Sequence, residues 1–89
     1  MTYTIIWHDA AQNDLRSLDR QITARIVKKV RSIELNPYRF VEHLEGYPFF
    51  KLRIGDYRAI VDINAAERKV KVILVGHRSK VYKEISQRI

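Results

Sequence analysis

The sequence contains no cysteine, so disulfide bonds, zinc–thiolate sites and iron–sulfur clusters are all excluded. It has no apolar run that approaches the ~20 residues of a membrane-spanning helix. The first residues, "MTYTIIWHDAAQ", lack the basic start and the long apolar stretch of a signal peptide. We therefore expect a cytoplasmic protein without membrane association, and a reducing compartment suits the missing cysteine.

Recognisable metal and nucleophile motifs are also missing from the sequence. The histidines His8, His43 and His77 are scattered along the chain and form no helical ligand pair such as H-E-x-x-H. The serines lie in helical or capping contexts, and none sits in a nucleophile-elbow pattern. We therefore predict a function that uses neither a metal ion nor another cofactor.

Acidic residues are few, and the excess positive charge is concentrated in the second half of the chain. The net charge of +7 divides into +1 over residues 1–45 (7 Lys/Arg, 6 Asp/Glu) and +6 over residues 46–89 (10 Lys/Arg, 4 Asp/Glu). With 46% hydrophobic and 30% charged residues, the 89-residue chain is typical of one small folded domain, residues 1–89. The basic half favours nucleic acid or an acidic protein segment as partner, although a lysine-rich soluble surface explains it equally well.

The pattern of apolar residues predicts an α+β domain with the order β-α-α-β-β-β-α. The two neighbouring helices should form a hairpin packed on a small, mostly antiparallel, twisted sheet. Asp9, Asp19 and Ser79 are the expected N-caps of the three helices, and Val81, Ile85 and Ile89 should share one face of the last. The expected elements are strand 3–7, helix 9–18, helix 19–36, loop 37–48, strands 49–54, 57–64 and 69–76, and a final helix after residue 79.

The stretch "KLRIGDYR", residues 51–58, predicts two strands joined by a two-residue turn at Gly55-Asp56. Alternation along the strands separates an apolar face, which should pack on the helices, from a face that carries Lys51, Arg53 and Arg58. The register sets Arg53 opposite Arg58, and facing like charges cost roughly a few tenths of a kcal/mol. We therefore interpret the pair as an anion site and expect that neutralising either arginine leaves stability equal or higher.

The segment "GHRSKVY" follows the last strand and adds further polar residues at its end. If this corner lies beside the hairpin, four cations and a phenol converge on one concave surface, which suits a phosphate. The alternative is a basic face covered by long, mobile side chains. His77 and Lys80 are weaker candidates for substrate contacts. The predicted catalytic residues are Lys51, Arg53, Arg58, Arg78 and Tyr82.

Nearly end to end, the sequence resembles the RelE/ParE superfamily of bacterial and archaeal toxins. The tracts "YPFFKLRIGDYRAIVDI" and "VKVILVGHRSKVY" carry the resemblance. It implies a small basic α+β toxin that an antitoxin neutralises through an acidic or amphipathic segment, in a toxin–antitoxin assembly. RelE-like members cleave mRNA in the ribosomal A site, whereas ParE-like members inhibit DNA gyrase.

The resemblance to RelE-like members extends to the predicted site. It implies that Lys51 and Arg53 are the basic pair of the first hairpin strand, with Arg53 where the best-known members have lysine. Arg58 matches the arginine of the second strand. Arg78 and Tyr82 match the C-terminal pair, although they lie closer together in sequence than in some members.

We therefore expect a metal-independent endoribonuclease that acts on mRNA bound to the ribosome. Attack by the RNA's own 2′-OH builds negative charge on the phosphate, which Arg58 and Arg78 would stabilise with support from Arg53. Tyr82 and Lys51 rank above His77 as the base, and Tyr82 has stacking on a nucleobase as its other role. The competing interpretations are a ParE-like gyrase inhibitor and a non-enzymatic nucleic-acid-binding module.

Overall fold

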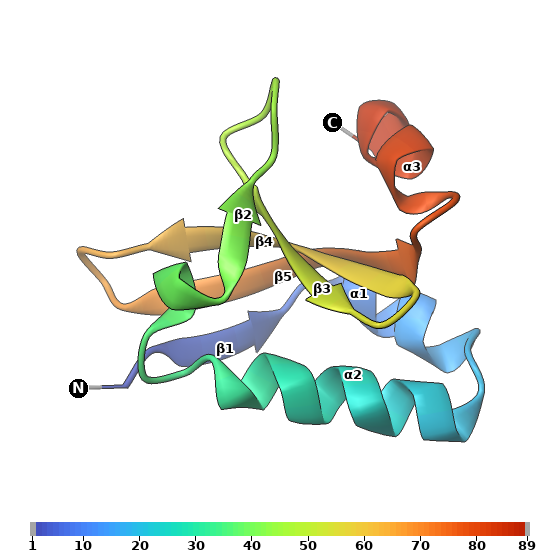
Figure 1. Cartoon of the computed structure of the whole chain (residues 1–89), viewed down its shortest axis with the longest axis horizontal. Coiled ribbons are helices and arrows are strands. Elements are labelled where there is room, and N and C mark those ends of the chain that lie inside the picture. Colours follow the sequence, from blue (N-terminus) through green and yellow to red (C-terminus); the bar gives the residue numbers. More distant parts are fainter. Residues whose placement is uncertain (1, 89) are drawn as a thin grey trace.

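The structure, a computed structural model, describes residues 2–88 and has an α+β fold with a five-stranded sheet (Figure 1). The strands lie in the order β1-β5-β4-β3-β2; β1 pairs with β5 in parallel, and the other pairs are antiparallel. The predicted fold class is confirmed. The elements are β1 (Thr4–Trp7), α1 (Asp9–Arg16), α2 (Arg20–Ser32), the 3₁₀ turn η1 (Pro37–Arg39), β2 (Val41–His43), β3 (Phe50–Ile54), β4 (Tyr57–Asn64), β5 (Lys69–His77) and α3 (Val81–Arg88).

The predicted loop over residues 37–48 is wrong, because it contains η1 and β2. β2 has three residues, of which only Val41 is hydrophobic, so it shows no alternation that a sequence pattern could reveal. It forms by pairing with β3, which sets Val41 opposite Leu52 and Glu42 opposite Lys51. This pairing brings residues from the predicted loop to the basic face of the hairpin.

Of the three predicted helix caps, one is confirmed. The Asp19 carboxylate accepts a hydrogen bond from the Gln21 N–H at 2.8 Å, as expected for the N-cap of α2. His8 rather than Asp9 caps α1, through its Nδ1 atom and the Ala10 N–H. Ser79 lies two residues before α3, and its hydroxyl contacts His77 instead of the helix. The predicted face position of Ile89 lies outside the described residues.

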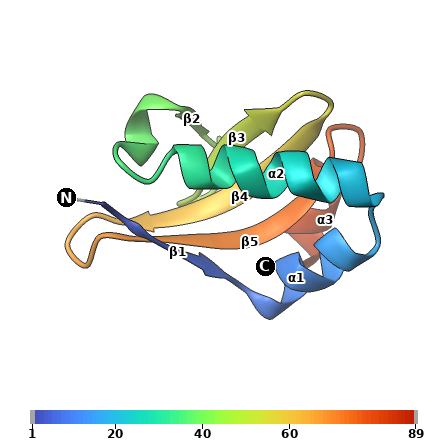
Figure 2. The same ribbon diagram turned by 90° about the horizontal axis from the view of Figure 1, so that it is seen from below.

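Two hydrophobic clusters cover opposite faces of the sheet. In the larger, Ile26 and Val30 of α2 pack on Leu52 and Val61, which confirms the predicted apolar face of the hairpin. The smaller cluster holds α3 on the other face (Figure 2). It comprises the buried residues Leu44, Ile60, Leu74, Val81 and Ile85.

The β3–β4 hairpin has the predicted register, with Arg53 opposite Arg58 and Ile54 opposite Tyr57. Gly55 has a φ of 58°, a conformation that favours glycine at the first position of the turn. None of the helices within residues 2–88 is long and apolar enough to cross a membrane.

Candidate active site

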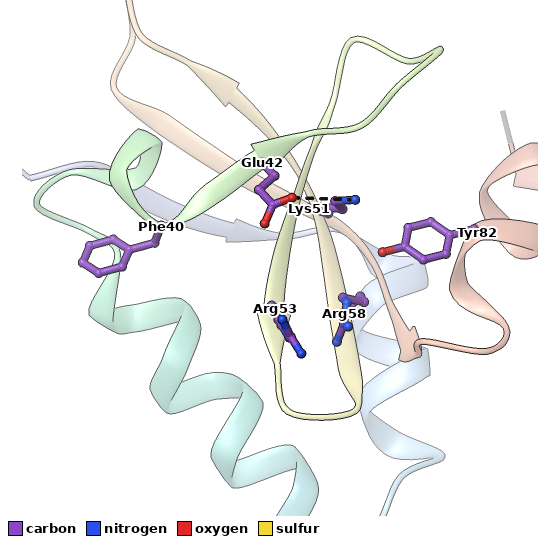
Figure 3. A pocket seen from close by; sticks show the side chains of 6 residues that line it. All are labelled: Phe40, Glu42, Lys51, Arg53, Arg58 and Tyr82. Carbon is purple, nitrogen blue, oxygen red and sulfur yellow. Dashed lines mark ion pairs between the residues drawn. The ribbon is translucent and has the colours of Figure 1, made fainter.

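A hollow of about 160 Å³ lies on the face of the β3–β4 hairpin that α1 and α2 leave uncovered. Strands β2, β3 and β4 form its floor, and Tyr82 of α3 forms one side (Figure 3). Six residues line this hollow, called the basic hollow below: Phe40, Glu42, Lys51, Arg53, Arg58 and Tyr82.

Lys51 is placed between an acidic and an aromatic neighbour. Its Nζ lies 3.9 Å from Glu42 Oε2 and 5.8 Å from the centre of the Tyr82 ring. The Glu42 side chain is 77% exposed, so this ion pair contributes little to stability. An entering phosphate can therefore replace Glu42 as the partner of Lys51 at little cost.

Arg53 and Arg58 face each other across the hairpin, but their guanidinium groups have different surroundings. Arg58 Nη1 donates to the carbonyls of Gly55 and Tyr57, both at 2.8 Å, so its guanidinium is anchored on the turn. Arg53 is exposed, and the structure shows no ion pair for it within residues 2–88. The anchoring of Arg58 was missed from sequence, although its position three residues after Gly55 suits such a contact.

Tyr82 directs its phenol oxygen toward the basic hollow (Figure 3) and is 38% exposed. Its place in the first turn of α3 is as predicted, and its neighbours Val81 and Ile85 are buried against the sheet. The docking of α3 therefore determines where the phenol lies.

A second set of contacts ties the end of α3 to α1. Arg88 donates to both carboxylate oxygens of Asp14, at 3.0 and 2.8 Å, and lies 3.2 Å from Glu84. Asp14 Oδ2 also accepts a hydrogen bond from the Val75 N–H at 3.0 Å. Val75 lies past Val72, the last residue of β5 that pairs with β1. The hydrogen bond to Asp14 raises the pKa of Arg88 above its ordinary value. One carboxylate thus satisfies a backbone group of β5 and holds α3.

Arg78 was predicted to converge on the same surface as Lys51, Arg53 and Arg58, but it does not line the basic hollow. Its Nε lies 3.7 Å from Asp56 Oδ1, and its backbone N–H donates to the Asp56 carbonyl at 2.8 Å. The reason is that β5 ends at His77, so the chain bends toward the β3–β4 turn before α3 begins. Arg78 is therefore beside the turn on which Arg58 is anchored, and its side chain is 62% exposed.

His77 and Lys80, the weaker candidates, lie outside the basic hollow as well. His77 pairs in register with Tyr57, on the face opposite Arg58, and the two rings are 5.4 Å apart. Its Nδ1 is 2.8 Å from Ser79 Oγ. Lys80 is exposed and lines a different cavity together with His77.

Phe40 and Glu42 are the two residues of the basic hollow that sequence reasoning missed. Both lie in the stretch interpreted as a loop, and the pairing of β2 with β3 brings them to the site. No group of three or more metal-ligating side chains is placed to bind an ion within residues 2–88. The chemistry available in the basic hollow is that of three cations, a phenol and one carboxylate.

Comparison with known families identifies the chain. The sequence model of the ParE toxin of type II toxin–antitoxin systems (parDE) matches residues 5–82. The chain belongs to the ParE toxin family. Comparison of this ParE-family toxin with curated proteins returns no match.

Solved structures place the ParE-family toxin beside RelE proteins as well. A chain of the RelBE2 toxin–antitoxin complex from Mycobacterium tuberculosis has 27% identity and a TM-score of 0.80, over 88% of this toxin and 100% of that chain. A mutant of the E. coli toxin RelE in the free state has 29% identity and a TM-score of 0.76, over 100% and 99%. A chain of the archaeal RelE–RelB complex from Pyrococcus horikoshii has 27% identity and a TM-score of 0.75, over 91% and 100%. The predicted RelE/ParE superfamily is confirmed.

Proposed function

We propose that this toxin is a metal-independent endoribonuclease that cleaves mRNA in the ribosomal A site. The observation that supports this most is the convergence of Lys51, Arg53, Arg58 and Tyr82 on one hollow. Three cations around a phenol suit a substrate with a phosphate to stabilise and a proton to move.

In the proposed reaction the 2′-oxygen of the RNA attacks the adjacent phosphorus, and the bond from phosphorus to the 5′-oxygen breaks. Arg58 binds the turn through Nη1 alone, which leaves the donors on Nη2 and Nε for phosphate oxygens. Arg53 supplies a second guanidinium opposite it. These two arginines would stabilise the negative charge that accumulates on the phosphate.

Tyr82 and Lys51 are the proton carriers of this proposal. One removes the proton from the 2′-OH and the other returns a proton to the departing 5′-oxygen, so that the products are a 2′,3′-cyclic phosphate and a 5′-OH. Their closeness, with Lys51 Nζ 5.8 Å from the centre of the Tyr82 ring, would allow both to act on one phosphate. Arg78 has a supporting role, because its weak exposed pair with Asp56 leaves it free to contact a neighbouring phosphate.

Primer extension in a reconstituted translation extract tests the proposal. Wild type should cut at A-site codons, and Lys51→Met and Tyr82→Phe should each lower the single-turnover cleavage rate by roughly 10²-fold or more. Lys71→Met, the same change on an exposed position of β5 outside the basic hollow, is the control and should cut normally. Wild type that cuts no codon, or full activity in both site variants, would overturn the proposal.

We further propose that the toxin is neutralised by an antitoxin that binds it as a hetero-oligomer. The relatives from M. tuberculosis and P. horikoshii were solved as toxin–antitoxin and RelE–RelB complexes. An acidic or amphipathic antitoxin segment would complement the +7 charge of this toxin. Coexpression of the neighbouring reading frame should abolish the growth arrest that the toxin alone produces.

Inhibition of DNA gyrase is the second candidate function. The observation in its favour is that the matching family model is the one for ParE toxins. A supercoiling assay with purified gyrase separates the two: the ribonuclease proposal predicts no inhibition at toxin concentrations that arrest translation. Inhibition of gyrase without any mRNA cleavage would assign the toxin to the ParE activity.

A further inference from the structure

A second basic depression adjoins the basic hollow. It has a volume of about 400 Å³, lies between α2 and the β3–β4 turn, and is called the α2 groove below. Arg53 lines both depressions, so the α2 groove and the basic hollow adjoin at this residue. The residues of the α2 groove are Arg25, Lys28, Lys29, Ser32, Arg53, Ile54 and Gly55.

The cations of the α2 groove are unbalanced by acidic residues. Arg25, Lys28 and Lys29 make no ion pair in the part of the chain that the structure describes. The Arg25 side chain lies close to the β3–β4 turn: a Cβ atom added at Gly55 would be 2.9 Å from Arg25 Nη2. Gathering these charges beside Arg53 is unfavourable for the isolated protein, and an anion across the groove would relieve the repulsion.

Phe40 of the basic hollow has a cation of the α2 groove, Lys29, beside its ring. It lines the basic hollow, is 43% exposed, and has Lys29 Nζ at 5.6 Å and Arg39 Cζ at 5.8 Å from its ring centre. An exposed aromatic ring between cations is the arrangement by which proteins stack a nucleobase while neutralising its backbone. A peptide of acidic residues alone would use the cations but gain nothing from the exposed ring face.

We propose that the α2 groove binds the RNA strand next to the cleaved phosphate. The phosphates of the flanking nucleotides contact Arg25, Lys28 and Lys29, and a base stacks on Phe40. This inference rests on the proposed ribonuclease function and adds to it a path for the substrate. It also gives α2 a part in substrate binding. Without this role, its charged residues would form an ordinary solvent-exposed face.

Binding of non-cleavable RNA tests the path. Fluorescence anisotropy is measured with 2′-O-methyl oligonucleotides of three and nine nucleotides, the shorter filling the basic hollow alone. Wild type should bind the nonamer more tightly, and Arg25→Gln/Lys29→Gln should remove that gain without weakening the trimer. Losing two phosphate contacts should reduce the slope of log K against log salt by about 1.4 and weaken nonamer binding about tenfold or more at 0.1 M salt.

The control is Arg20→Gln/Arg31→Gln, which removes the same charge from exposed positions of α2 outside the groove. It should keep most of the nonamer gain. A second variant, Phe40→Leu, should weaken RNA but leave binding of a polyglutamate peptide unchanged, since only a base uses the ring. If Arg25→Gln/Lys29→Gln loses polyglutamate binding but keeps the nonamer gain, the groove belongs to an acidic protein and the inference is overturned.

The two proposals fail in different ways. A toxin that cleaves mRNA in the extract but binds trimer and nonamer equally would retain the proposed function and lose the α2 path. A toxin that neither cleaves mRNA nor binds either oligonucleotide would overturn the proposed function itself.

Discussion

Arg53 and Arg58 face each other on β3 and β4, but their charged groups have different surroundings. The Arg58 guanidinium binds two turn carbonyls, whereas Arg53 is exposed beside both basic depressions. Arg58 therefore holds the turn, and under the proposed function both arginines would remain accessible to a phosphate. The expectation that neutralising either arginine leaves stability equal or higher now applies to Arg53 alone.

Chemical denaturation should give different free energies of unfolding for Arg53→Gln and Arg58→Gln. Arg53→Gln should leave the free energy of unfolding within about 0.5 kcal/mol of wild type, or raise it, by removing a facing like charge. Arg58→Gln should lower it by about 1 kcal/mol, because two hydrogen bonds to the turn are lost. Both should reduce cleavage in the primer-extension assay. Equal stability of the two variants would mean that the Arg58 contacts do not hold the turn.

At the level of the elements, sequence patterns predicted what depends on local periodicity. The hairpin register, the presence of α2 and the first-turn position of Tyr82 on α3 follow from spacing alone, although α2 ends at Ser32 and not at the predicted residue 36. The strand β2 does not, because three residues carry no period and its pairing with β3 is a tertiary contact. Phe40 and Glu42 were missed for the same reason. The displacement of Arg78 depends on how the chain bends after β5, which spacing does not determine.

The link between Asp14 and Arg88 is another contact that no local pattern reveals, since 74 residues separate them. It joins α3 to α1 and so supports the position of Tyr82. Because the pKa of Arg88 is raised, its contribution is present at neutral pH and falls as pH rises through that raised value. Mildly alkaline buffers should therefore leave this link intact.

Arg88→Met should loosen α3 and lower cleavage without changing any residue of the basic hollow. The loss of two charge-assisted hydrogen bonds should reduce the free energy of unfolding by about 1–2 kcal/mol. The control, Lys83→Met, alters an exposed cation of the same helix that makes no ion pair within residues 2–88, and should behave as wild type. A double-mutant cycle with Asp14→Asn should show a coupling energy above about 0.5 kcal/mol. Additive effects would mean that the link is not energetically significant.

Across the whole molecule, the sheet is covered unequally, and this inequality creates the site. The larger cluster under α1 and α2 holds the fold together, and the smaller cluster under α3 covers only part of the other face. The basic hollow is one of the parts that α3 leaves uncovered. The cations of β3 and β4 therefore sit on a rigid floor, whereas the phenol of Tyr82 comes from an element with fewer buried residues behind it.

Truncating one isoleucine in each cluster tests this division. Ile26 is 0% exposed in the larger cluster and Ile85 is 1% exposed in the smaller. Ile→Ala at either site should therefore destabilise the packed cluster that contains the residue by about 2–5 kcal/mol. Ile26→Ala should accelerate hydrogen exchange throughout the sheet and helices. Ile85→Ala should accelerate it mainly in α3, because that helix can detach while the larger cluster stays packed.

Cleavage activity gives the second readout of the same pair. Ile85→Ala should lose most activity at temperatures where β4 and β5 still protect their amides, because Tyr82 no longer faces the basic hollow. Ile26→Ala should lose activity only in step with global unfolding. Exchange that rises equally across the chain in both variants would show that the two clusters unfold as one unit. The position of Tyr82 would then be as stable as the floor of the site.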